Sequence, residues 1–185
     1  MYIDRLLYPV TALGPGKRIA LWVSGCSRHC KQCANPELWE RHEYQKITSE
    51  KLVKAINSVI ERGIDGITIT GGEPFDQAAE LCEVIDELPE QINVLVFSGY
   101  RYAELLEKED SRELLSRIDV LIDGEYVDEL NDNNSALRGS LNQHIWYLNK
   151  EVQLEYEKYL SEGRKIQNFV YDYKIISVGI HNRSL

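Results

Sequence analysis

Residues 66–100 read GITITGGEPFDQAAELCEVIDELPEQINVLVFSGY and hold one complete strand–helix–strand unit. The runs Gly66–Thr70 and Val94–Phe97 are short and apolar, as is typical of buried strands. Between them, one apolar stripe recurs at helical spacing through Ala78, Leu81, Cys82, Ile85 and Leu88, within a helix expected over Asp76–Leu88. A strand, a helix and a second strand in this order predict a right-handed βαβ unit and a parallel sheet.

The same alternation continues on both sides of this unit. Ala20–Val23 and Val120–Ile122 are further buried runs, and Lys51–Arg62 carries a helical apolar stripe. Another helix or helix pair is expected over Tyr102–Arg117, and Tyr2–Tyr8 is expected to be an edge strand. The sequence therefore predicts an α/β fold built around four parallel strands.

The pattern changes after the fourth expected strand. Asp123–Arg138 is rich in Asp, Asn and Gly and predicts a long loop. A helix is expected over Glu151–Leu160, followed by a closing strand or hairpin over Phe169–Tyr173 and Ile175–Gly179. We therefore predict a core over residues 1–150 and a C-terminal extension over 151–185 that packs on it.

Composition and charge narrow the class of protein. The chain has 185 residues, of which 43% are hydrophobic and 28% charged, as in an ordinary single globular domain. We expect no membrane contact, because no run of about 18 apolar residues occurs and the N-terminus lacks the pattern of a secretory signal. We expect no nucleic-acid partner, because the net charge is −9 and no basic stripe is present. A cytoplasmic location follows from these expectations.

Three of the four cysteines lie within eight residues, at Cys26, Cys30 and Cys33. In a reducing compartment such thiols are free and suggest a metal site. Zinc would need a fourth ligand, such as the distant His144 or His181, whereas three thiolates on one short loop suit an iron–sulfur cluster with one open iron. The cluster is favoured, with zinc or no metal as alternatives. The fourth cysteine, Cys82, is expected in the core.

The unusual residues all follow expected strands. Cys26 follows the first strand, Gly71 the second, Ser98 the third and Asp123 the fourth. Because the carboxyl ends of parallel strands meet at one edge of a sheet, these positions predict a single shared site.

With Gly71-Gly72-Glu73-Pro74 after the second strand, the Cys-x3-Cys-x2-Cys loop resembles radical S-adenosylmethionine (SAM) enzymes. Within that superfamily the chain is most similar to the proteins that activate anaerobic ribonucleotide reductase. The further matching pieces are Gly14-Pro15-Gly16, Leu21–Cys26, Ser98-Gly99-Tyr100, Val120–Gly124 and Arg138–Gln143.

This resemblance implies an oxidoreductase with an open, partial parallel (β/α) barrel. Cys26, Cys30 and Cys33 would hold a [4Fe–4S] cluster that reductively cleaves SAM to a 5′-deoxyadenosyl radical. The chain would act as a glycyl-radical-activating enzyme, and its partner would be a glycyl radical enzyme, most simply an anaerobic ribonucleotide reductase. A flavodoxin- or ferredoxin-like protein would supply the electron.

The resemblance also suggests how SAM is held. Gly71 and Gly72 would let the backbone approach its methionine part, although an ordinary turn would need the same glycines. Glu73 would accept a hydrogen bond from its ammonium group or, alternatively, favour the start of the following helix, and Pro74 would fix the turn.

Four further residues are assigned to the site or its rim. Ser98 would meet the ribose hydroxyls and Tyr100 would flank the cofactor, or they would be a turn residue and a packed aromatic. Asp123 and Arg138 are expected at the rim of the site or in partner contact.

Two departures from the activating proteins leave other functions open. Ala34 stands where an aromatic residue is usual, and the tail from Lys150 to Leu185 is longer than in the short activating proteins. The tail resembles a group of stand-alone small radical SAM proteins, so a radical SAM enzyme for another peptide or a small molecule is the alternative function. A non-catalytic iron–sulfur or zinc interaction module is the third.

Overall fold

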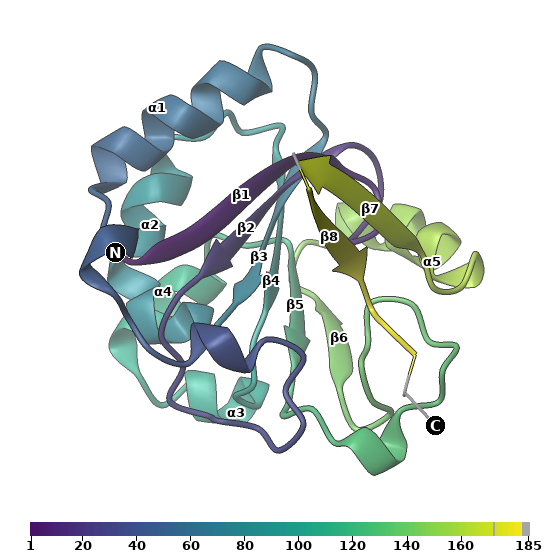
Figure 1. Ribbon diagram of the computed structural model, residues 1–185. Coiled ribbons are helices and arrows are strands. Elements are labelled where there is room, and N and C mark those ends of the chain that lie inside the picture. Colours follow the sequence, from purple (N-terminus) through teal and green to yellow (C-terminus); the bar gives the residue numbers. More distant parts are fainter. Residues whose placement is uncertain (172, 183–185) are drawn as a thin grey trace.

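The computed structural model describes residues 1–171 and 173–182. At its centre is a mixed six-stranded sheet with strand order β1-β2-β3-β4-β5-β6 (Figure 1). The strands are β1 (Ile3–Val10), β2 (Arg18–Val23), β3 (Gly66–Gly71), β4 (Asn93–Phe97), β5 (Val120–Asp123) and β6 (His144–Tyr147). Strands β2 to β5 are parallel, and β1 and β6 run antiparallel to their neighbours at the two edges. A separate antiparallel hairpin is formed by β7 (Ile166–Tyr171) and β8 (Lys174–Gly179).

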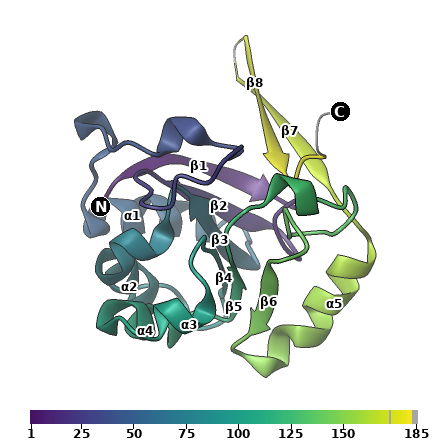
Figure 2. The same cartoon turned by 90° about the horizontal axis from the view of Figure 1, so that it is seen from below.

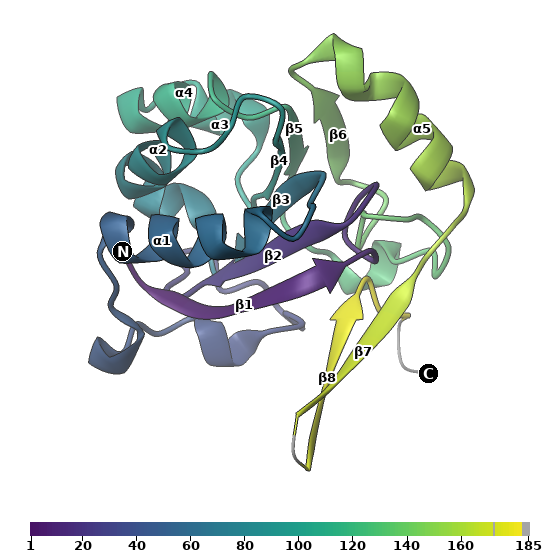
Figure 3. The ribbon, with the colours of Figure 1, turned by 90° about the horizontal axis from the view of Figure 1, so that it is seen from above.

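The helices cover both faces of the sheet. They are α1 (Ser49–Ile60), α2 (Ala78–Asp86), α3 (Tyr102–Leu105), α4 (Glu109–Leu115) and α5 (Gln153–Ser161). Short 3-10 helices lie at Pro36–Leu38, Glu43–Gln45, Pro74–Gln77, Asp128–Leu130 and Lys150–Val152. Helices α1 to α4 lie on one face, and α5 and the hairpin lie on the other (Figure 3). No helix in the described part of the chain is long and apolar enough to cross a membrane.

Local sequence sets the limits of α1. The hydroxyl of Thr48 accepts a hydrogen bond from the backbone N–H of Lys51 and caps the first turn. Leu52 and Ile56 form its buried stripe, and Gly63 follows with a φ of 77°. The predicted helix over Lys51–Arg62 is therefore confirmed, with small shifts at its ends.

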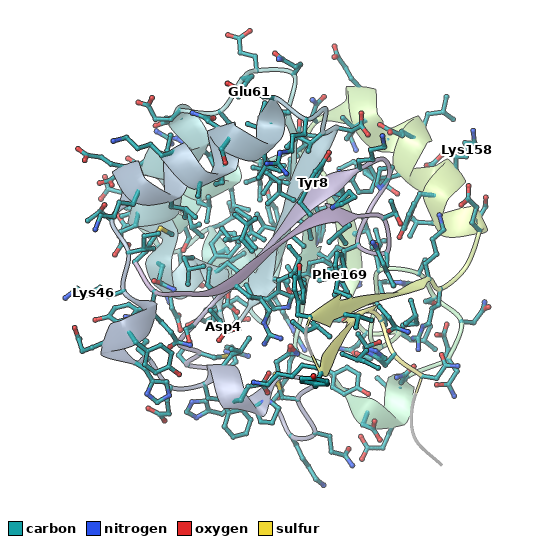
Figure 4. All side chains as sticks on the ribbon, turned by 45° about the horizontal axis from the view of Figure 1, so that its top comes forward. Asp4, Tyr8, Lys46, Glu61, Lys158 and Phe169 are labelled. Atoms are coloured by element: carbon teal, nitrogen blue, oxygen red, sulfur yellow. The ribbon has the colours of Figure 1, made fainter. Side chains whose placement is uncertain are left out.

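The core is divided by the alternation of side chains along the sheet. On β2, Ile19, Leu21 and Val23 pack in the cluster under α1, α2 and α4. Ala20 and Trp22 point to the opposite face, where they pack with Val178 of the hairpin. Phe169, labelled in Figure 4, packs against the same cluster.

The predicted α/β fold with a parallel sheet is confirmed, but the partial barrel is not. After β5 the chain returns as an antiparallel edge strand instead of adding another βα unit, so the sheet ends there. The sequence reasoning missed β6, whose side chains alternate between exposed and half-buried. Strand β6 has only four residues and follows a loop rich in Asn and Gly, so its alternation of side chains is too short to be recognised in the sequence.

The segment that follows residue 150 contacts the body of the fold through two tyrosines of α5. Tyr156 is fully buried, and its hydroxyl donates a 2.5 Å hydrogen bond to Oδ1 of Asn93 at the start of β4. The hydroxyl of Tyr159 donates to the backbone oxygen of Thr11 at 3.1 Å. The division into a core over 1–150 and an extension over 151–185 remains a prediction, and we propose that the two parts fold together.

Replacing Tyr156 with alanine tests that proposal. Removing a buried aromatic side chain leaves a cavity, and we expect the free energy of unfolding to fall by about 3–5 kcal/mol. Tyr173→Ala is the matched control, because that side chain is fully exposed and its loss should change nothing. Urea denaturation measures both variants. A Tyr156→Ala cost below about 1 kcal/mol would mean that the extension is an independent appendage.

Candidate functional site

A cavity of about 590 Å³ lies at the carboxyl ends of the parallel strands. This is the lower end of the sheet in Figure 1, and Figure 2 views the molecule from that side. Cys26, Cys30 and Cys33 all border it, and Gly71, Gly72 and Glu73 border it from the end of β3. Phe97, Ser98 and Gly99 contribute from β4, and Gly124 contributes from β5. The cavity therefore brings together residues that follow all four parallel strands, although Asp123 itself does not border it.

Two backbone hydrogen bonds hold the start of the cysteine loop against the segment that contains Leu38 and Trp39. Gly25 donates to Leu38 at 2.8 Å, and Cys26 donates to Trp39 at 3.0 Å. Two residues inside the loop, His29 and Gln32, have positive φ angles. Such conformations are uncommon for residues other than glycine, and they bend the loop so that all three thiols reach the same cavity.

Burial raises the pKa of the thiols of Cys26 and Cys30 above their ordinary value. For Cys26, the nearby carboxylates of Glu73 and Asp76 add to this effect. Hydrogen bonds from the backbone partly oppose it at both cysteines. The raised pKa of Cys26 and Cys30 favours their protonated forms, so metal binding at these two thiols must displace their protons.

The Gly-Gly-Glu-Pro turn is held against the backbone that leads into the cysteine loop. The N–H of Gly72 donates to the oxygen of Val23 at 2.8 Å, and that of Glu73 donates to the oxygen of Gly25 at 2.8 Å. A Cβ at Gly72 would lie 2.2 Å from that same oxygen of Gly25. The packing of the protein itself therefore requires glycine at position 72, whether or not a ligand also approaches the backbone there. Pro74 is buried and starts the 3-10 helix without bordering the cavity.

Glu73 ties this turn to the end of β4. Its side chain is buried, with an exposed fraction of 1%. One carboxylate oxygen accepts from the N–H of Phe75 at 3.0 Å and the hydroxyl of Ser98 at 2.9 Å. The other accepts from the N–H of Gly99 at 2.8 Å. Burial raises the pKa of Glu73 to about 7, although these hydrogen bonds favour the charged form.

Glu73→Gln tests this balance, since glutamine does not titrate. The folded-state pKa of about 7 exceeds the ordinary value of 4.5, so the folded protein binds more protons between these values. The contribution of Glu73 to stability is therefore complete below about pH 4.5 and is lost as the pH rises through 7. We expect the melting temperature of the wild-type protein, relative to the variant, to fall between about pH 5 and pH 8. A difference that does not change with pH would contradict the raised pKa.

Ser98 borders the cavity, but its hydroxyl already donates to Glu73. A contact with the ribose would have to use its remaining acceptor capacity. Tyr100 does not border the cavity: its hydroxyl bonds Ser27 at 2.8 Å and Asp76 at 3.1 Å. The guanidinium of Arg28 lies over its ring at 4.8 Å. Tyr100 thus braces the cysteine loop from outside, which is the packed-aromatic alternative.

Asp123 and Arg138 also lie away from the rim. Asp123 is buried, and its carboxylate accepts from the backbone N–H of Tyr102 at 2.6 Å. Arg138 borders a different cavity, between the loop after β5 and α5. Cys82 is in the main core, as predicted.

Three parts of the cavity wall were not predicted from the sequence, and one of them is the loop after β5, where Tyr126, Asp128 and Asn131 border the cavity. Trp39 borders it from the segment after the cysteines, and the last described residues, Gly179–Asn182, border it from the C-terminal extension. Trp39 lies six residues after Cys33, so its closeness in sequence to the cysteine motif could have indicated that it lies near the site. His181 was considered only as a distant zinc ligand, and no local pattern in the sequence indicates that the whole segment Gly179–Asn182 returns to the cysteines.

The cavity suits an iron–sulfur cluster better than zinc. Among the described residues, no three His, Cys, Asp or Glu side chains lie close enough together to hold one metal ion. The thiols instead share a roomy cavity, as the separate corners of a cluster require. The backbone N–H of Asn35 donates to the sulfur of Cys33 at 3.4 Å.

Two further N–H groups fit the same interpretation. Nε1 of Trp39 and Nε of Arg28 are buried in residues that border the cavity, and neither has a hydrogen-bond partner among the described residues. An unpaired buried donor costs about 1–3 kcal/mol. Cluster sulfur atoms are acceptors that would relieve this cost, and such hydrogen bonds tune a cluster's reduction potential.

Comparison with known proteins gives a consistent set of similarities. A family model described as a 4Fe-4S single cluster domain matches residues 12–146. The anaerobic ribonucleoside-triphosphate reductase-activating protein of Vibrio cholerae is 36% identical over 148 residues, which cover 75% of this chain and 93% of that protein. The protein of the same name from Escherichia coli K12 is 30% identical over 149 residues, covering 76% of this chain and 96% of that protein. The crystal structure of QueE from Escherichia coli aligns over 53% of this chain and 52% of that one, at 18% identity and a TM-score of 0.42.

Proposed function

The chain belongs to the family of anaerobic ribonucleoside-triphosphate reductase-activating proteins, which confirms the resemblance found in the sequence, and we propose that it places a glycyl radical on such a reductase. The observation that carries the proposal is one cavity bordered by both the three-cysteine loop and the Gly-Gly-Glu-Pro turn. The match along 93–96% of these relatives supports the same activity for this chain.

We assign Cys26, Cys30 and Cys33 as the ligands of a [4Fe–4S] cluster with one iron left open for SAM. Bound together and reduced by one electron, the cluster and SAM supply methionine and a 5′-deoxyadenosyl radical, which takes a hydrogen atom from the substrate. The radical chemistry belongs to the cofactors, and the protein binds them, orients them and excludes water.

Glu73 and the turn around it would orient SAM. The carboxylate is held in place by three donors, from Phe75, Ser98 and Gly99. It borders the cavity, where it would accept a charge-assisted hydrogen bond from the ammonium group of SAM. That bond would lower the pKa of Glu73 and keep it ionised.

The proposed partner and electron donor follow from the surroundings of the cavity. Exposed residues such as Gln32 border the cavity, so a flexible loop of a large enzyme can bring a glycine to it at a modest ordering cost. Lys31 is exposed on the cysteine loop, where a positive charge would favour an acidic flavodoxin- or ferredoxin-like donor. Free cysteine ligands need a reducing compartment, so we place the protein in the cytoplasm.

The SAM chemistry is tested without any partner. Anaerobically reconstituted and reduced protein, mixed with SAM, should slowly release equal amounts of 5′-deoxyadenosine and methionine. Oxidised protein is the control and should release neither. A cluster-loaded protein that binds SAM but never cleaves it would contradict the radical SAM activity and favour a non-catalytic iron–sulfur module.

The C-terminal extension motivates a second function. The family model ends at residue 146, and α5 and the hairpin lie beyond it. An enzyme with added structure beside its site can act on another peptide or on a small molecule. Cleavage of SAM without radical formation on the reductase would favour this alternative.

A further inference from the structure

The chain ends its described course beside the cysteines. Gly179, Ile180, His181 and Asn182 border the same cavity as Cys26, Cys30 and Cys33. The side chains of His181 and Asn182 are exposed, which places them at the mouth of the cavity. We call Gly179–Asn182 the C-terminal wall. It lies outside the region that the family model matches.

One arginine fastens this wall to the loop that follows β5. Arg164 lies between α5 and β7, and its side chain has an exposed fraction of 7%. Its guanidinium donates to the backbone oxygen of His181 at 2.9 Å and to Oδ1 of Asn131 at 2.8 Å. Its Nε donates to the backbone oxygen of Ser135 at 3.0 Å. Because Asn131 also borders the cavity, a single side chain joins two parts of the cavity boundary.

The hairpin that delivers the wall is itself fixed in place. Val178 is buried with an exposed fraction of 2%. The side-chain amide of Gln167 accepts from the N–H of Thr11 and donates to the oxygen of Pro9, both at 2.8 Å. Gly179 then turns the chain with a φ of 136°, and a Cβ there would lie 2.2 Å from the backbone oxygen of Lys165. The wall therefore starts from a rigid point and not from a loose tail.

We propose that the C-terminal wall determines which substrate enters, and that Arg164 is its positioning residue. This inference rests on the proposed function, whose substrate is a glycine in an extended peptide segment, and adds the part of this chain that selects that segment. In the reaction one hydrogen atom moves from the glycine Cα to the 5′ carbon of the deoxyadenosyl radical, giving 5′-deoxyadenosine and a glycine-centred radical. Because the wall borders the mouth, we expect a peptide whose central residue carries a side chain to be admitted less readily than a peptide with glycine there.

The role of Arg164 is tested with Arg164→Met and the conservative Arg164→Lys. Arg117→Met is the control. Arg117 forms an ion pair with Asp86 of α2 at 2.7 Å, and it does not border the cavity that holds the cysteines. The probes are short synthetic peptides with glycine or alanine at the centre, and the readout is the 5′-deoxyadenosine that each peptide stimulates. Wild type and Arg117→Met should prefer the glycine peptide, and in Arg164→Met this preference should fall several-fold, with Arg164→Lys between them.

A second readout is independent of the substrate. Iron extraction from the loaded cluster by a chelator should be several-fold faster in Arg164→Met, because the mouth is wider. Iron content and melting temperature are measured on every variant. If Arg164→Met does not fold, the exposed pair His181→Ala and Asn182→Ala replaces it.

The two readouts separate this inference from the proposed function. Unchanged peptide preference and unchanged extraction in a folded, loaded variant would overturn the role of the wall. If wild-type protein ignores both peptides while extraction is faster in Arg164→Met, the wall is a barrier but its selection of peptides is wrong, and the proposed function is left to its own test on the reductase.

Discussion

Cys30→Ala is expected to abolish assembly of the [4Fe–4S] cluster. Cys26, Cys30 and Cys33 each border the cavity, and no fourth cysteine lies near enough to replace a lost ligand, since Cys82 is buried in the main core. Three thiolates ligate three of the four irons and leave the fourth open. The loss of any one thiolate leaves a second iron without a protein ligand. Iron content should fall from about four per chain to near zero, together with the brown absorption that dithionite bleaches.

Cys82→Ala is the matched control for this result. It removes a thiol of the same chain and should leave iron content unchanged, at a modest cost in stability for a buried small residue. Cys26→Ala and Cys33→Ala should behave like Cys30→Ala. A Cys30→Ala protein that still binds about four irons would contradict the assignment of this loop as the cluster ligand.

Gly72→Val is expected to disrupt the cysteine loop as well as SAM binding. Even a Cβ at this position would lie 2.2 Å from the oxygen and 2.8 Å from the carbonyl carbon of Gly25, the residue before Cys26. Because backbone atoms cannot swing aside as a flexible side chain can, the turn and the loop must separate. The hydrogen bonds from Gly72 to Val23 and from Glu73 to Gly25 would be lost with them. We expect a large drop in melting temperature and poor iron loading.

Gly63→Ala separates this steric effect from the general cost of replacing glycine. Gly63 has a φ of 77°, and a Cβ there would meet nothing within 4 Å. The variant should lose about 1–2 kcal/mol through backbone strain and keep its cluster. If Gly72→Val keeps a wild-type melting temperature and iron content and loses only SAM affinity, the turn serves the ligand alone.

The local parts of the fold could be predicted because each rests on a short-range pattern. Gly66–Thr70 and Val94–Phe97 are continuous apolar runs, and they became β3 and β4 with changes of one residue at their ends. The predicted hairpin is also present as β7 and β8, although Val170 and Ile175, apolar in sequence, are 69% and 70% exposed. Apolar character alone did not tell which face of an edge hairpin packs on the core.

The parts of the site that depend on distant contacts could not be predicted. The cysteines were recognisable by spacing, but the closing of the cavity by Gly179–Asn182 depends on Arg164, which joins His181 to the loop after β5 at Asn131 and Ser135. Tyr100 follows the site residue Ser98 by two positions, yet it turns outward to Ser27 and Asp76. The position of Tyr100 in the sequence therefore predicted correctly that its loop lies at the site. It did not predict that the side chain of Tyr100 points away from the cavity.

Electron paramagnetic resonance of the partner reductase tests the central claim most directly. Reduced, cluster-loaded protein, SAM and the anaerobic ribonucleotide reductase of the same genome are mixed without oxygen, with Cys30→Ala protein as the control. We expect the doublet of a glycyl radical on the reductase, with one 5′-deoxyadenosine formed per radical, and no signal with the control. Abundant 5′-deoxyadenosine with no radical on the reductase would contradict it.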